Sequence, residues 1–308
     1  MTPLVRVTDL KRAYGDVFAI DGISLTLEAG APIGVVGPNG AGKTTFFSVL
    51  CGFLRPTRGT VEVMGRPPLH PELYGRVAIL PQDAAFVRGV PVWVQLAFLA
   101  ELQGFDRAAA KAEAARVLKS VLLEDAAGKP PEAMSHGMLK RVAIAQTFIG
   151  SPELVFLDEP TAGLDPASAE HVRSLVRSLA GERTFIVSSH NLDDIEQLCG
   201  SIVILKQGKV TEHRKVSELV SRTSCLTLRL EADPPENAGE LFGVLPGVTR
   251  VERGRPGEHR LTVHYRESDA DAAQVAVLQA LSKAGIAFLE MSRGQSLQDR
   301  VVEMTRRD

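Results

Sequence analysis

The sequence predicts an α/β protein, in which a doubly wound sheet with an antiparallel β edge carries a helical insertion and is followed by a small α+β module. Three observations support this. A glycine-rich loop at 37–44 joins an apolar strand to a helix, and a second apolar run at 154–157 ends in two carboxylates. Between them, residues from about 83 to 150 are mostly helix formers. We place the first domain at 1–222, with its helical subdomain at about 83–150, and the second at 223–308.

The length, charge and cysteine content of the chain exclude some classes of function. The chain has 308 residues and 44% hydrophobic content, enough for a large domain and a smaller one. A net charge of −2 argues against a nucleic-acid partner, which would need a basic excess. The three cysteines lie far apart in the chain, which favours a reducing cytosol. We expect no signal peptide, because residues 1–6 lack its charged and apolar blocks, and no membrane span, because no run of 18 apolar residues occurs.

The N-terminal region predicts short strands. Leu4–Leu10 and Ile23–Leu27 alternate as strands do, and residues 14–16 form a turn between them. Further β-like runs occupy 61–64 and 77–80, on either side of a proline-rich loop. The compact apolar run Ile33–Val36 is the strand that leads into the glycine-rich loop.

The glycine-rich loop matches G-x-x-x-x-G-K-[ST], a phosphate-binding pattern. Its glycines let successive backbone N–H groups turn toward one phosphate, and the positive end of a helix that starts at Lys43 adds to them. The Lys43 ammonium can reach the β- and γ-phosphates, and the Thr44 hydroxyl can ligate Mg²⁺. The motif therefore predicts a nucleoside triphosphate site. Its residues, with the threonine that follows, are Gly37, Pro38, Asn39, Gly40, Ala41, Gly42, Lys43, Thr44 and Thr45.

The second apolar run narrows the chemistry. Leu154–Leu157 reads as a strand buried on both faces, and it delivers Asp158 and Glu159 at its C-terminal end, where ligands bind in open α/β sheets. Asp158 suits Mg²⁺, and Glu159 could polarise an attacking water as a general base. The phosphate loop alone leaves kinases, GTPases, ATPases and motors open. The absence of an Asn-Lys-x-Asp motif weighs against a GTPase.

The remaining segments continue the alternation. Asp106–Leu123 predicts a solvated amphipathic helix, and Asp165, followed by Pro166, caps a helix that runs to about Leu179. Strands are expected at 185–187 and 202–205. From Thr223 the pattern becomes β-α-β-β-α-β, typical of a ferredoxin-like module, with a final helix from Ser296. The expected elements of this module are strands at 226–230, 248–253, 259–265 and 286–291 and helices at 237–245 and 269–284.

Taken in order, the motifs of residues 1 to about 220 resemble the ATP-binding subunit of an ABC transporter. The phosphate loop matches Walker A and 154–159 matches Walker B. The other matches are Gln82 (Q-loop), 134–138 (signature), 163–165 with Asp165 (D-loop), His190 (switch histidine) and Tyr14 (an aromatic on adenine).

The resemblance implies a role for each of these residues. Gln82 would touch Mg²⁺ or the attacking water, and His190 would hydrogen-bond the γ-phosphate. Tyr14 would stack on adenine, with a core aromatic as the alternative. Ser135 and Gly137 would donate to the γ-phosphate held by the opposite subunit, and Ser135 is also a good N-cap.

The signature departs from Leu-Ser-Gly-Gly-Gln at three positions, where Met134, His136 and Met138 stand. With Lys140 and Arg141 after it, this form resembles bacterial exporter-type members. The alternative is a damaged signature with slow or absent turnover.

The resemblance implies a homodimer, or a heterodimer with a homologous ATPase, around two ATP and Mg²⁺. A separate permease at the cytoplasmic face of the cell membrane would dock on the helical insertion. The tail resembles the C-terminal extension of drug- and polysaccharide-exporter ATPases, with 295–299 close to its Ser-Leu-x-Asp element, and would stabilise the dimer or serve as a passive appendage. Two other functions stay open: a soluble ABC-type ATPase of translation or DNA repair, and an ATP-gated regulatory protein.

Overall fold

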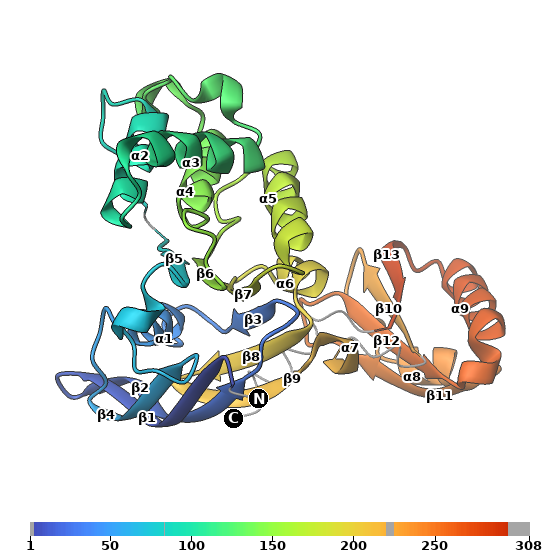
Figure 1. The fold of residues 1–308 in the computed structure, drawn as a ribbon. Helices are drawn as coiled ribbons and strands as arrows, with labels where there is room; N and C mark the ends of the chain where they lie inside the picture. Colours follow the sequence, from blue (N-terminus) through green and yellow to red (C-terminus); the bar gives the residue numbers. More distant parts are fainter. Residues whose placement is uncertain (1–2, 83, 220–224, 295–308) are drawn as a thin grey trace. The chain divides into compact units, whose positions relative to one another are not determined.

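The fold is taken from a computed structural model, which describes residues 3–82, 84–219 and 225–294. It divides into two compact units, Met1–Val216 and Ser217–Asp308, and Figure 1 shows their elements. The sequence boundary after residue 222 falls in a segment outside the described residues. No helix in the described part of the chain has both the length and the apolar character that a membrane crossing requires.

A six-stranded sheet forms the centre of the first unit, in the order β5-β6-β7-β3-β8-β9. The first five of these are parallel and β9 pairs antiparallel with β8, so the expected α/β sheet with an antiparallel edge is confirmed. Every residue of β3, β6 and β7 is buried, as expected for strands covered on both faces. The strands are β3 (Ile33–Val36), β5 (Val77–Leu80), β6 (Leu154–Asp158), β7 (Thr184–Ser188), β8 (Ser201–Lys206) and β9 (Lys209–Lys215).

A second, antiparallel sheet has the order β2-β1-β4. It consists of β1 (Val5–Tyr14), β2 (Val17–Leu27) and β4 (Arg58–Val63). Both long strands extend beyond the alternating runs that predicted them, because the hairpin pairing continues through register shifts as far as Tyr14 and Val17. The N–H of Asp21 donates to the carbonyl of Gly208 (2.8 Å), which joins β2 to the β8–β9 hairpin of the central sheet.

Four helices of the first unit begin at residues whose side chains cap them. Asp106 accepts from the N–H groups of Ala108 and Ala109 (both 2.9 Å), and Asp165 caps α5 as predicted. The helices are α1 (Lys43–Leu50), α2 (Val92–Leu102), α3 (Arg107–Ser120), α4 (His136–Gln146), α5 (Pro166–Leu179), α6 (Leu192–Leu198) and, across the unit boundary, α7 (Val216–Leu219), with 3₁₀ turns η1 (Pro71–Leu73), η2 (Glu124–Ala126) and η3 (Pro131–Ala133). Three of them, α2 to α4, form the expected helical insertion (green in Figure 1).

The second unit is a four-stranded antiparallel sheet in the order β11-β12-β10-β13. With two helices in a β-α-β-β-α-β succession, this order confirms the ferredoxin-like prediction. Its core gathers apolar side chains such as Leu228, Phe242, Val263 and Val277. The helix expected from Ser296 lies outside the described residues. The elements are β10 (Cys225–Leu230), α8 (Ala238–Gly243), β11 (Val248–Arg253), β12 (Arg260–Tyr265), η4 (Glu267–Asp269), α9 (Ala270–Ala284) and β13 (Phe288–Arg293).

An aromatic pair anchors α1 to the central sheet, which fixes the helix that follows the phosphate loop. The ring of Phe156 on β6 meets that of Phe47 on α1 edge to face, with centroids 5.4 Å apart, and both are fully buried. We expect Phe156→Ala to lower the free energy of unfolding by about 3–5 kcal/mol, because it leaves a cavity in the core. Urea denaturation measures this. Phe53→Ala, at a 64% exposed position, is the control; equal losses for the two variants would contradict the assignment.

Candidate active site

Four motif-bearing loops meet at one edge of the central sheet. Strands β5, β6, β7 and β3 are neighbours and run parallel, so their C-terminal ends lie side by side. Gln82 follows β5, Asp158 ends β6, His190 follows β7 and Gly37 follows β3. The register places Ser188 opposite both Asp158 and Val35. The fold therefore brings these sequence-predicted residues to one edge.

The phosphate loop is closed around its own lysine. The Lys43 ammonium donates to the carbonyl oxygens of Gly37 (2.8 Å) and Pro38 (3.4 Å), and the residue is buried. A lysine ammonium has three N–H donors, so one remains for a phosphate oxygen. The rim of the loop, Pro38 to Gly40, and Thr44 are exposed, whereas Ala41 is buried and Thr45 half-buried.

Two of the loop glycines are required by the protein itself. A Cβ at Gly37 would lie 2.2 Å from the carbonyl oxygen of Leu205, and one at Gly42 would lie 2.4 Å from that of Ala19. A Cβ at Gly40 would meet nothing within 4 Å, but its φ of +80° favours glycine. From the sequence, all three glycines are expected because they let backbone N–H groups turn toward a phosphate. The structure adds that two of them pack against neighbouring backbone.

The N-terminus of α1 is suited to an anion. Gly42 is its N-cap in the left-handed conformation, no side chain caps the first turn, and that turn holds no acidic residue. The first backbone N–H groups of a helix have no partner within it and carry its positive dipole end. A phosphate group fits this arrangement.

A buried serine links the carboxylate of Asp158 to the backbone of Glu159 in Walker B. The Ser188 hydroxyl donates to Oδ1 of Asp158 and accepts from the backbone N–H of Glu159 (3.1 Å). That N–H also donates to the Ser188 carbonyl oxygen (3.2 Å). Sequence reasoning missed this role. The signal available was a polar residue at the end of an otherwise apolar strand.

Glu159 and His190 form a pair. Oε2 of Glu159 lies 2.7 Å from Nδ1 of His190 and accepts from its backbone N–H at 3.3 Å. Glu159 is buried, whereas the His190 side chain is 62% exposed. Glu159 also has a φ of +50°, which a residue with a Cβ adopts only under constraint. The carboxylate is therefore held beside an imidazole that faces solvent.

The structure places Gln82 and Tyr14 at exposed positions. Gln82 lies in the turn after β5 and lines a cavity of about 590 Å³ together with His136 and Lys140 of α4. Tyr14 ends β1 and is 49% exposed, with the Arg12 guanidinium 4.8 Å from its ring centroid. The exposure of Tyr14 excludes the core-aromatic alternative.

The signature residues lie at the start of α4. Ser135 is its N-cap and accepts from the N–H of Met138 (3.2 Å), as predicted. A Cβ at Gly137 would lie 2.7 Å from Oγ of Ser168 on α5, so glycine allows the first turns of α4 and α5 to approach closely. Asp165, the cap of α5, accepts from the N–H of Ser168 (3.0 Å), and this bond lowers the pKa of the Asp165 carboxyl.

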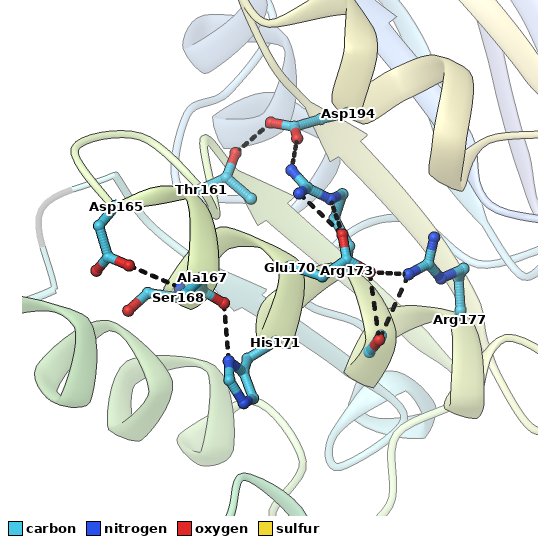
Figure 2. A network of polar contacts seen from close by, with 10 residues as sticks. Thr161, Asp165, Ala167, Ser168, Glu170, His171, Arg173, Arg177 and Asp194 are labelled. Atoms are coloured by element: carbon cyan, nitrogen blue, oxygen red, sulfur yellow. Dashed lines mark hydrogen bonds and ion pairs between the residues drawn. The ribbon is translucent and has the colours of Figure 1, made fainter.

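A second feature that sequence reasoning missed is a polar network on α5 and α6 (Figure 2). Asp194 lies on α6 and is buried. Its carboxylate accepts hydrogen bonds from the Thr161 hydroxyl and the Arg173 guanidinium, both at 2.5 Å. The bond to Thr161 therefore connects the loop after β6 to α6. Burial alone would lower the pKa of Arg173, but its bonds to Asp194 and Glu170 raise it above its usual value. Neither strand nor helix periodicity marks these residues.

The arrangement fits a magnesium–nucleoside triphosphate. The loop and helix N-terminus suit the phosphates, and the Thr44 hydroxyl and Asp158 carboxylate are oxygen ligands of the kind Mg²⁺ takes, usually together with phosphate oxygens. Loop, carboxylates and sheet edge together define a phosphate-loop nucleotide hydrolase.

Comparisons with known proteins give the family. Residues 20–162 match the family model described as ABC transporter. The chain is 31% identical to the daunorubicin/doxorubicin resistance ATP-binding protein DrrA of Streptomyces peucetius, covering 97% of this chain and 91% of that one. It is 34% identical to the bacitracin transport ATP-binding protein BcrA of Bacillus licheniformis, over 72% and 73% of the two chains. The chain therefore belongs to the ABC transporter ATP-binding proteins; it binds ATP and is a transport ATPase.

Solved structures agree. The cbiO1 protein of Clostridium perfringens, part of an ABC transporter complex, aligns with a TM-score of 0.64 and 27% identity, over 71% of this chain and 91% of that chain. A bacterial Atm1-family ABC exporter with ATP bound aligns with a TM-score of 0.63 and 27% identity, over 72% and 40%.

The glycine geometry gives a test at this site. We expect Gly42→Ala to weaken ATP binding and lower the melting temperature, because its Cβ would push against the Ala19 carbonyl. Gly40→Ala is the matched control for stability, since it has room for a Cβ within the protein and should lose only about 1 kcal/mol of unfolding free energy from its positive φ. Thermal unfolding and titration with a fluorescent ATP analogue measure both. If Gly42→Ala and Gly40→Ala lowered the melting temperature equally, the contact with the Ala19 carbonyl would be unimportant.

Proposed function

We propose that this chain is the ATP-hydrolysing subunit that dimerises around two MgATP and drives a separate membrane permease, in the direction of export. The observation that carries the proposal is the meeting of the phosphate loop, the two Walker B carboxylates and His190 at one sheet edge. Family membership supports the ATPase, and relatives named for drug resistance and bacitracin transport support export.

Each of the site residues has a separate role in ATP hydrolysis. Lys43 and the N–H groups at the start of α1 hold the β- and γ-phosphates. Glu159 takes a proton from the attacking water, and its pairing with His190 keeps the carboxylate oriented while the imidazole can contact the γ-phosphate. Mg²⁺, held through Thr44 and Asp158 with Gln82 nearby, would neutralise charge on the phosphates.

Dimerisation completes the site. The chain has one phosphate loop and one signature, on β3–α1 and at the start of α4. Ser135 and Gly137 begin α4, so their N-terminal turn can direct its positive dipole end at the γ-phosphate held by a second subunit. Asp165, at the start of the adjoining α5, would lie at the same junction. The partner is a second copy or a homologous ATPase.

A groove in the first unit suits a permease at the cytoplasmic face of the membrane. It encloses about 490 Å³ and is lined by segments of α1, η1, β5 and the end of α2. Four of its apolar side chains, Phe53, Leu69, Tyr74 and Leu102, are each more than half exposed. We expect a helical segment of the permease to cover them, because such an apolar group is typical of an interaction site. Strand β5, which lines the groove, leads into the turn that holds Gln82, and this connects the groove to the nucleotide site.

The role of Lys43 gives the first test. Lys43→Ala should abolish high-affinity MgATP binding, weakening it by about 10- to 100-fold or more, because a charge-assisted bond to phosphate is lost. Isothermal titration calorimetry measures the affinity, and circular dichroism checks the fold. Lys111→Ala, at a distant lysine over the Trp93 ring, is the control. Unchanged affinity in Lys43→Ala would refute the site.

The role of Glu159 gives the second. Glu159→Gln should leave ATP binding intact, lower turnover by about 10²- to 10⁴-fold as loss of a general base does, and trap a MgATP-bound dimer. Phosphate release and sedimentation velocity measure turnover and association. A variant that turns over ATP at the wild-type rate would exclude Glu159 as the base, and one that stays monomeric with MgATP would exclude the sandwich dimer.

A further inference from the structure

We propose that Asp194 is a positioning residue for ATP hydrolysis, which acts with Thr161 and Arg173 to hold Glu159 in its catalytic conformation. The inference rests on the proposed role of Glu159 as the base. It concerns three side chains that do not belong to the sequence motifs of the site.

The network bridges the two segments that carry the reacting groups. Glu159 and Thr161 lie two residues apart in the loop after β6, and His190 and Asp194 lie four residues apart after β7. Two contacts between side chains link the segments beyond the ends of the strands. One link is the Glu159–His190 pair at 2.7 Å, and the other is the Thr161–Asp194 hydrogen bond at 2.5 Å.

Of these two contacts, the Thr161–Asp194 hydrogen bond is the one whose two side chains are both buried. The His190 side chain is 62% exposed, whereas Asp194 is 2% and Thr161 8% exposed. A charge-assisted hydrogen bond shielded from water is held more firmly than one at the surface, where water competes for both partners. We therefore assign the alignment of the two loops to the Thr161–Asp194 bond more than to the exposed imidazole.

Arg173 completes the clamp. It donates to Oδ1 of Asp194 while Thr161 donates to Oδ2, so both carboxylate oxygens are occupied. Arg173 also pairs with Glu170 on α5 (2.9 Å), and Figure 2 shows the chain of contacts from Thr161 through Asp194 to Arg173 and Glu170. Asp194 is thereby fixed between α5, α6 and the loop after β6.

Glu159 needs such support. Its φ of +50° is a left-handed conformation, which persists in a residue with a Cβ only where the surroundings impose it. On one side, its N–H is held by Ser188. On the other, its carbonyl accepts from Ala162 (3.3 Å), in the same turn as Thr161. Releasing Thr161 would free this turn and allow the Glu159 carboxylate to leave its productive position.

Thr161→Val tests this with the least structural change, because it removes the hydroxyl and keeps the shape. We expect kcat for ATP hydrolysis to fall about tenfold, as for a small misplacement of a catalytic group, with the Kd for MgATP unchanged. Thr161→Ser, which restores the hydroxyl, should recover most of the rate. Thr184→Val is the matched control: its buried hydroxyl accepts from Gly30 at the opposite edge of the sheet, and we expect wild-type kcat.

A double-mutant cycle separates positioning from general destabilisation. If Thr161 acts through Glu159, then Thr161→Val added to Glu159→Gln should cause no further loss in single-turnover rate. Independent, multiplicative losses would overturn the proposal, as would a wild-type kcat in Thr161→Val or an equal loss in Thr184→Val. If Glu159→Gln itself keeps the wild-type rate, the assignment of the base fails first, and the positioning role fails with it.

Discussion

The parallel alignment of β5, β6, β7 and β3 is the constraint on which the rest of the site depends. A parallel sheet delivers every strand to the same edge with the same polarity, so loops that are far apart in sequence become neighbours without any long-range contact of their own. The backbone pairing that places Ser188 opposite Asp158 also brings its hydroxyl within reach of the Asp158 carboxylate and the backbone N–H of Glu159. The register of the strands thus determines which side chains can meet at the site.

Prediction from sequence succeeded where the pattern is local. The apolar runs at β3, β6 and β7, the cap Asp165 and the β-α-β-β-α-β succession of the small unit all follow from periodicity and capping chemistry. The phosphate loop can be recognised from the sequence because its functional residues are adjacent in the chain. The assignments of Gln82 and His190 to catalysis, and of Ser135 to the γ-phosphate of the opposite subunit, come from the order of motifs and stay predictions.

What the sequence could not show depends on contacts between distant segments. Ser188, Thr161 and Asp194 are ordinary polar residues within their own elements, and their meaning appears only when β6 and β7 lie side by side. The reason for Gly37 and Gly42 is similar, since the atoms that exclude a Cβ belong to Leu205 and Ala19. Gly137 likewise has a packing reason, its approach to Ser168, in addition to the phosphate contact that the resemblance implies.

The left-handed backbone at Glu159 carries a consequence for how this chain can change over generations. A glycine there would relieve about 1–2 kcal/mol of backbone strain, so the replacement most comfortable for the fold is one that has no carboxylate. Stability and activity are in opposition at this one position. Homologous subunits that no longer need to hydrolyse ATP could therefore accumulate substitutions that raise stability and abolish activity. A glycine directly after the Walker B aspartate would indicate such a loss of function.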